Sequence, residues 1–130
     1  MKLSSKARYG LKAMCYMAEN YGNGVVSLPT MAQSTGISEK YLEQLIATLR
    51  KAGLVEATRG ASGGYCLARS PEEINVGEIL RELEDGLVII DCISGDCADK
   101  CMCSTYNVWN KLYKAINSCL DEMSLDSLIK

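Results

Sequence analysis

Four cysteines lie within twelve residues in the second half of this 130-residue chain, in the segment DCISGDCADKCMCS. They are Cys92, Cys97, Cys101 and Cys103, separated by four, three and one residues. Zinc sites commonly use C-x2-C pairs, and this segment contains none. The spacing suits an irregular loop wrapped around an iron–sulfur cluster, because thiolates hold such clusters and Gly95 lets the loop bend.

The other chemistries that these thiols allow are, in order, a zinc site and bare thiol–disulfide sensing. An aspartate oxygen within the segment could complete a ligand set. The chain has no histidine, which removes the Ser-His and Cys-His catalytic arrangements, and it has no C-x-x-C redox motif. We therefore expect a protein that is not an enzyme. Cys15 and Cys66 are predicted to be packing residues, and Cys119 is assigned no role.

Charge is divided unevenly along the chain. Residues 1–70 contain nine basic and four acidic residues, whereas residues 71–130 contain five basic and twelve acidic residues. Only the first half is suited to neutralise phosphates, so any nucleic acid should bind there. The start of the chain has no apolar run typical of a signal peptide, and no apolar stretch is long enough for a membrane span, which predicts a soluble cytoplasmic protein.

Three helices are predicted before residue 54. The first carries a stripe at helical spacing and should end near Gly22; its apolar positions are Ala7, Leu11, Met14 and Ala18. The second should run from Leu28 to Thr35, with Ser27 as N-cap and Gly36 as its stop. The third should begin after Ser38 and end at Gly53, with one apolar and one polar face. The last two helices fit a helix-turn-helix, although many helical hairpins look alike.

A β-hairpin is predicted directly after these helices. Residues 54–58 and 65–68 read as strands, and the loop between them contains Arg59 and three glycines. A helix-turn-helix followed by a hairpin is a winged helix, and an arginine at the tip suits a narrow minor groove. The alternative is an ordinary glycine-rich turn with a solvated Arg59. A nucleotide-binding loop is disfavoured, because the Walker lysine spacing is missing.

The rest of the chain should add two helices and a final helical turn. Asn75 and Glu78 are placed as a capping box for the first helix. The second should begin near residue 104 and run to about Leu120, with an apolar stripe made by Trp109, Leu112, Tyr113, Ile116 and Leu120. The final turn is predicted over residues 125–129, with Ser124 as its cap. Little chain remains to cover the stripe, so we expect it to form a two-fold homodimer interface; the alternative is packing against its own domain.

The predicted fold is therefore mainly α with a small β-hairpin wing. It divides into a winged helix-turn-helix over residues 1–84, and a cysteine-rich loop with a dimerisation helix over residues 85–130. Nearly the whole chain resembles the Rrf2 family of bacterial winged-helix transcription regulators, in particular its IscR-like iron–sulfur branch. The segments that carry the resemblance are MKLSSKARYGLKAM, GISEKYLEQLIATLRKAGLV, RGASGGYCLAR, INVGEILRELE and the cysteine loop leading into a Trp-containing helix.

The resemblance implies a homodimer that binds a near-palindromic double-stranded DNA operator. It implies that the recognition helix reads the major groove through Ser38, Tyr41, Glu43 and Gln44. It also implies that Arg59 enters the minor groove. Phosphate contacts are then expected from Lys2, Ser4, Lys40, Arg50 and Lys51. Glu43 can accept from cytosine N4 and repels phosphate, so its role should be discrimination more than affinity.

The resemblance also implies three cysteine ligands before the long helix, with five residues between the last of them and a tryptophan. Cys103 and Trp109 keep that spacing, which selects Cys92 and Cys97 as the other two ligands. The first gap has four residues where the iron–sulfur branch has five, and Tyr106 replaces the histidine that serves as fourth ligand there. The fourth ligand is then Cys101, an aspartate or a group of the partner subunit.

The function implied is regulation, as a repressor, of iron–sulfur assembly or related genes through a cluster, with [2Fe–2S] preferred over [4Fe–4S]. A zinc- or thiol-based regulator responding to redox state or nitric oxide is the alternative. The nitric-oxide-sensing branch of the family uses an acid in the first helix, whereas this chain has Lys6, Ala7, Arg8 and Tyr9 there. Cysteine-metabolism repressors of the same fold lack the cysteine loop, so we rank repression of cysteine metabolism below regulation through a cluster.

Overall fold

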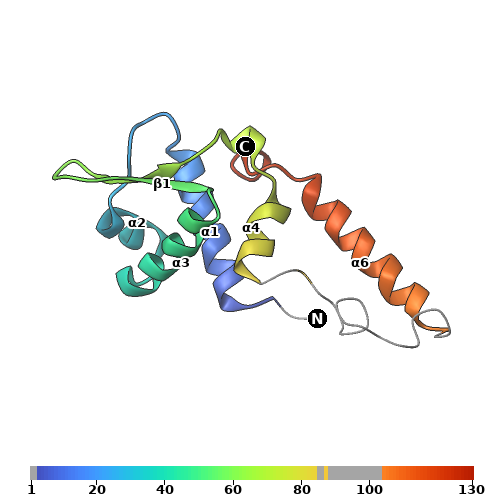
Figure 1. The fold of residues 1–130 in the computed structure, drawn as a ribbon. Helices are drawn as coiled ribbons and strands as arrows, with labels where there is room; N and C mark the ends of the chain where they lie inside the picture. The colour runs from blue at the N-terminus through green and yellow to red at the C-terminus, as the bar shows by residue number, and fades with distance from the viewer. Residues whose placement is uncertain (1–2, 85–86, 88–103) are drawn as a thin grey trace.

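The computed structural model describes residues 3–84, 87 and 104–130. The four clustered cysteines and Lys2 lie outside the described residues. A compact body holds the first four helices and a hairpin, and a long helix extends away from it (Figure 1). No helix among the described residues is both long and apolar enough to cross a membrane.

Helix α1 spans Ser5–Glu19 and lies at the centre of the body. The Ser4 hydroxyl caps it by accepting from the Ala7 amide at 3.1 Å. The predicted stripe is confirmed at three positions that are buried, Ala7, Met14 and Ala18. The helix ends earlier than predicted, with Asn20 as C-cap, while Gly22 lies in the following turn with φ 90°.

Helices α2 (Leu28–Thr35) and α3 (Glu39–Lys51) form the predicted pair. The Ser27 and Ser38 hydroxyls cap them by accepting from Thr30 N and Tyr41 N. Gly36 ends α2 in the left-handed region, with φ 77°, where a glycine costs no steric strain. The apolar face of α3 is fully buried as predicted; it consists of Leu42, Leu45, Ile46 and Leu49.

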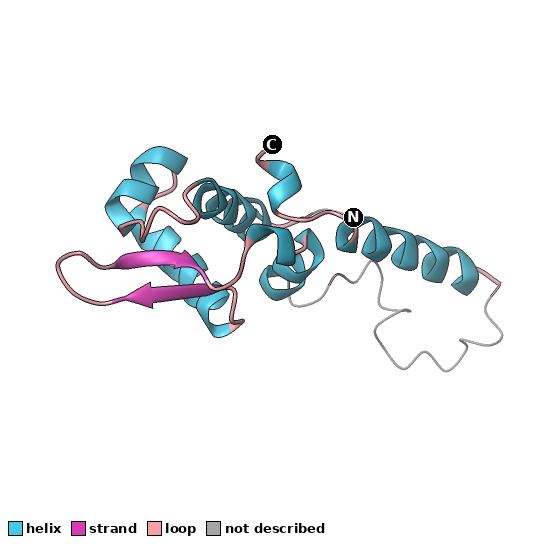
Figure 2. Cartoon of the chain, turned by 90° about the horizontal axis from the view of Figure 1, so that it is seen from above, coloured by secondary structure: helices cyan, strands magenta, loops and turns pink. Residues whose placement is uncertain are grey.

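Strands β1 (Val55–Thr58) and β2 (Gly64–Leu67) pair antiparallel, with Val55 opposite Leu67. The hairpin projects from the body as a ribbon beside α2 and α3 (Figure 2). Strand β2 has a further partner that the sequence did not indicate. Val26, in the segment that precedes α2, exchanges two backbone hydrogen bonds of 2.8 Å with Tyr65. The wing is thereby tied to the entrance of the helix-turn-helix.

Gly64 is required where the wing meets this segment. A Cβ atom at Gly64 would overlap the carbonyl oxygen of Val26, a backbone atom that cannot rotate away. We expect Gly64→Ala to lower the free energy of unfolding by about 1–3 kcal/mol, as overpacking does elsewhere. Urea denaturation followed by circular dichroism measures it. Ser62→Ala, at an exposed position in the same loop, is the control and should change stability by less than about 0.5 kcal/mol. Equal free energies of unfolding for the two variants would contradict the close approach of Gly64 to the Val26 carbonyl.

Helix α4 (Val76–Leu83) follows a short 3-10 turn, η1 (Pro71–Glu73). The predicted capping box is confirmed: Glu78 N donates to the Asn75 side chain at 2.8 Å, and Asn75 N donates to the Glu78 carboxylate at 3.1 Å. The apolar face of α4 is buried in the core, where the helix packs against α1 and α3. Helix α4 therefore connects the helix pair and the hairpin to the remainder of the chain.

Helix α6 spans Tyr106–Asp121 and is followed by the 3-10 turn η2 (Asp126–Leu128). This last turn is shorter than the predicted helix over residues 125–129. Its N-cap is Leu125 and not the predicted Ser124, although the Ser124 hydroxyl accepts from Ser127 N at 3.2 Å. Leu125 is completely buried, and its amide donates to the Ile74 carbonyl at 2.7 Å. The end of the chain thus returns to the core, while α6 itself has no buried residue.

Candidate DNA-binding interface

The face of α3 that points away from the core carries the residues predicted to meet DNA. Six of them are exposed: Ser38, Lys40, Glu43, Gln44, Arg50 and Lys51. Tyr41 differs, because its ring is half-buried and packs against the core. Polar side chains that are free of the core can follow a groove, so the geometry of α3 suits a recognition helix.

The turn between α2 and α3 begins at Thr35, a residue that the sequence did not single out, whose hydroxyl makes two local hydrogen bonds. Its hydroxyl donates to the Met31 carbonyl at 2.7 Å and accepts from the Ile37 amide at 3.3 Å. It is the one buried polar side chain in the described part of the core, with 5% of its surface exposed. A threonine directly before the glycine that ends a helix was the available signal, because such hydroxyls bond back to the preceding turn.

The wing brings Arg59 close to the end of the recognition helix. Arg59 is exposed at the tip, and the next residue, Gly60, has φ 109°. One surface hollow is lined by residues of both elements: Arg50, Ala57, Thr58, Arg59, Gly64 and Tyr65. Two arginines from separate elements thus border the same hollow, an arrangement suited to anionic DNA.

The start of α1 is tied to the end of α4. Ser4 donates from its amide to the Glu84 carboxylate at 2.6 Å, and its hydroxyl donates to the same oxygen. The hydroxyl of this predicted phosphate contact is therefore already engaged, both as a helix cap and with Glu84. Lys2, predicted beside it, lies outside the described residues.

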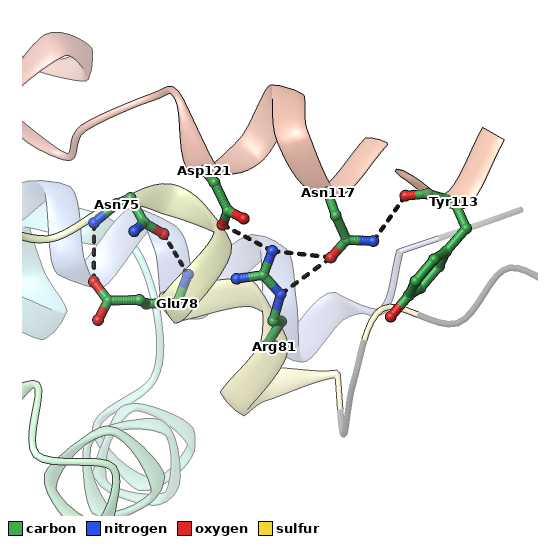
Figure 3. Close-up of polar contacts among 6 residues, drawn as sticks. All are labelled: Asn75, Glu78, Arg81, Tyr113, Asn117 and Asp121. Atoms are coloured by element: carbon green, nitrogen blue, oxygen red, sulfur yellow. Dashed lines mark hydrogen bonds and ion pairs between the residues drawn. The ribbon is translucent and has the colours of Figure 1, made fainter. Parts of the chain in front are cut away.

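Polar contacts dock α6 onto α4 (Figure 3). Arg81 donates to the Asn117 side-chain oxygen at 3.1 Å and 2.9 Å, and pairs with Asp121 at 2.7 Å. Asn117 in turn donates to the Tyr113 carbonyl at 2.8 Å, which orients its oxygen toward Arg81. A Cβ atom at Gly77 would overlap the Asp121 carboxylate and crowd the Arg81 guanidinium, so the absence of a side chain there leaves room for this ion pair.

The apolar stripe of α6 lies on a different side of the helix from the residues that contact Arg81. At about 100° per residue, Asn117 and Asp121 lie about 140° and 180° around the helix from Leu112. Leu112 and Val108 are 42% and 57% exposed. Of the five predicted stripe residues, only Leu120 packs against the core. The helix therefore turns a polar face to its own body, while Leu112 and Val108 are exposed and the other four stripe residues are half-buried.

Three cysteines lie within the described residues, and none is in a disulfide. Burial, and secondarily the Glu19 carboxylate, raise the pKa of the Cys15 thiol, so this cysteine stays protonated at neutral pH. Cys66 is half-buried on β2, and Cys119 is exposed on α6. Within residues 3–84, 87 and 104–130, no three acidic or cysteine side chains come together as a metal site. The predicted ligands Cys92, Cys97, Cys101 and Cys103 are not among those residues.

Comparison with known proteins identifies the fold and the class. Residues 3–130 match the Rrf2 family, described as iron-dependent transcriptional regulators. The chain is 40% identical to IscR of Aliivibrio salmonicida over 99% of this chain and 77% of that protein. The structure of T. potens IscR superposes with a TM-score of 0.80 at 46% identity, covering 98% of this chain and 86% of that one.

A second group is equally similar. The structure of CymR, the global cysteine regulator of B. subtilis, superposes with a TM-score of 0.82 at 38% identity, covering 99% of this chain and 96% of that one. Both groups consist of DNA-binding regulators and not of enzymes. The predicted winged helix-turn-helix is thereby confirmed. This chain belongs to the Rrf2 family of transcriptional regulators.

Proposed function

We propose that this protein is a cytoplasmic, homodimeric repressor that binds a near-palindromic operator and senses a cysteine-bound iron–sulfur cluster. The observation that carries the proposal is the joining of two features in one chain. A winged helix presents exposed polar and basic side chains, and four cysteines lie between α4 and α6 in the sequence. The genes that it controls would be those of iron–sulfur assembly or related functions, as for the iron–sulfur branch of the family.

Sequence readout is assigned to α3 and the wing. Ser38, Tyr41, Glu43 and Gln44 would meet base edges in the major groove, and Arg59 would enter the minor groove. Backbone phosphates would be held by Lys2, Lys40, Arg50 and Lys51. Ser4 is not included, because its amide and its hydroxyl both donate to the Glu84 carboxylate. The exposure of these side chains on α3 and the shared hollow of Arg50 and Arg59 support this division.

Arg59→Ala and Lys51→Ala should separate the two kinds of contact. Removing Arg59 should weaken binding by about 1–3 kcal/mol and reduce the preference for A·T pairs beside the major-groove site, because a narrow groove attracts the guanidinium. Removing Lys51 should weaken all sequences about equally. Fluorescence anisotropy on duplexes that differ only in those flanking pairs measures both effects. An Arg59→Ala variant that binds every duplex as the wild type does would reduce the wing tip to a turn.

The dimer interface is assigned to the apolar stripe of α6. Trp109 and Leu112 would lie in or beside it. A single small winged helix buries little DNA surface, whereas a two-fold dimer places two recognition helices on two half-sites. The polar docking of α6 through Arg81 supports this assignment, because it leaves Leu112 and Val108 exposed and available to a second copy.

The donor chemistry of the cysteine segment fits an iron–sulfur cluster, preferably [2Fe–2S]. Cys92, Cys97 and Cys103 are assigned as ligands, with Cys101, an aspartate or a group of the partner subunit as the fourth. When bound, the cluster supplies a centre whose presence or redox state can change with oxygen or iron supply. The chain supplies the connection to DNA: the cysteine segment follows Glu84, which contacts Ser4, and precedes α6, which contacts Arg81.

Anaerobic purification with an absorbance spectrum and iron and sulfide assays tests this proposal. A cluster gives a coloured protein containing both elements, whereas zinc gives a colourless one. The second candidate function, a zinc- or thiol-based regulator, is favoured by the likeness to the global cysteine regulator CymR. Colourless protein with one bound zinc, or with no metal, would support that candidate and contradict the cluster.

A further inference from the structure

Tyr41 of the recognition helix is not free to rotate in solvent. Its half-buried ring meets the ring of Tyr9 on α1 edge to face, with centroids 6.0 Å apart and planes at 86°. Both rings also pack against the core. Edge-to-face pairs of this kind are attractive beyond the area that they bury, so Tyr9 favours one orientation of Tyr41.

Tyr9 is itself held by a second contact. The guanidinium carbon of Arg8 lies 5.5 Å from the centroid of the Tyr9 ring, within cation–π range. Arg8 is exposed, whereas Tyr9 is half-buried. A chain of contacts therefore runs from the exposed Arg8 on α1, through the Tyr9 ring, to the Tyr41 ring on α3.

We propose that Tyr9 is a positioning residue for base readout, and that it acts by presetting the side-chain orientation of Tyr41. This inference rests on the proposed function, in which Tyr41 meets base edges. An unrestrained tyrosine samples several rotamers and must be ordered when DNA binds, which costs affinity for the correct sequence. A ring that is ordered beforehand avoids that cost, and it presents its hydroxyl to one base position.

The inference separates two quantities that a loss of fold would change together. Nonspecific binding depends on phosphate contacts and carries no sequence information. Loss of the Tyr9 ring should therefore leave affinity for unrelated DNA unchanged. It should lower the preference for the selected sequence by about two- to tenfold, the range expected for one aromatic pair.

The test uses the full chain, purified anaerobically, and duplexes selected by the wild-type protein from a randomised pool. The ratio of Kd on a scrambled duplex to Kd on the selected duplex is measured for Tyr9→Leu, Tyr9→Phe and Tyr16→Leu. Tyr16 is the matched control: it is a half-buried tyrosine on the same helix, and its hydroxyl accepts from Ser34 of α2 at 3.2 Å. We expect the ratio to fall for Tyr9→Leu only, since phenylalanine keeps the ring.

A double variant and a stability measurement complete the design. In a Tyr41→Ala background, Tyr9→Leu should have no further effect on the ratio, because the side chain that it positions is gone. An unchanged ratio in Tyr9→Leu, or equal falls in Tyr9→Leu and Tyr16→Leu, would overturn the inference. Should Tyr9→Leu be unfolded by circular dichroism, Tyr9→Met replaces it, since methionine fills irregular space. Failure of the wild type to select any sequence would instead contradict the proposed function.

Discussion

Alanine at Cys92, Cys97 or Cys103 is expected to remove the visible absorbance of the anaerobically purified protein almost completely. Thiolates are the bonds that hold an iron–sulfur cluster, so the loss of one ligand exposes iron to solvent and oxygen. The helices and the wing do not depend on this segment: the described core is formed by residues 7–83 together with Leu125. Iron, sulfide and absorbance should therefore fall together, while the circular dichroism spectrum stays unchanged.

Cys119→Ala is the matched control for this prediction. Cys119 is an exposed cysteine on α6, outside the cysteine segment, and its removal should leave the absorbance intact. Cys101→Ala decides the fourth ligand. A full spectrum in Cys101→Ala makes the fourth ligand an oxygen or a group of the partner subunit. Bleaching in Cys101→Ala with colour retained in Cys103→Ala would show that the spacing to Trp109 selects the wrong cysteine.

The second large effect is expected from Leu112→Glu. A carboxylate in the middle of the apolar stripe would be buried and unpaired in a dimer, so the protein should sediment as a monomer at micromolar concentration. A monomer reaches only one half-site, and we expect its affinity for a two-fold operator to fall by at least about 100-fold. Because Leu112 is 42% exposed in the single chain, the thermal midpoint of the monomer fold should change little.

Ser118→Glu adds the same charge to the same helix and serves as the control. Ser118 is exposed and lies about 120° around α6 from Leu112, away from the stripe. It should leave both the sedimentation coefficient and the DNA affinity as in the wild type. A Leu112→Glu protein that remains dimeric and binds its operator with full affinity would show that the dimer interface lies on another surface.

The parts of the fold that could be predicted are those set by local interactions. A serine before an apolar run predicts a cap, and Ser27 and Ser38 both cap their helices. Helical spacing predicts which residues are buried, and Leu42 and Leu49 are buried completely. Each of these signals involves residues within a few positions of one another, so the sequence displays them directly.

The parts that could not be predicted depend on contacts between distant residues. Nothing near Ser4 indicates that it meets Glu84, eighty positions later. The pairing of Val26 with Tyr65 likewise required the folded chain. Tyr41 was predicted as a base contact, but its packing against Tyr9 was not. The two residues lie on different helices, so helical spacing cannot indicate that their rings meet. The candidate cluster ligands remain a prediction, since residues 88–103 lie outside the described part of the chain.

The central claim is that the cluster controls DNA binding, and one titration tests it most directly. The protein is purified anaerobically, and fluorescence anisotropy follows its binding to a selected duplex before and after the iron is removed with a chelator, in the same buffer. We expect the Kd to differ by at least about tenfold between the two forms, or by 1.4 kcal/mol. Identical titration curves for the two forms would contradict the claim that this regulator senses its cluster.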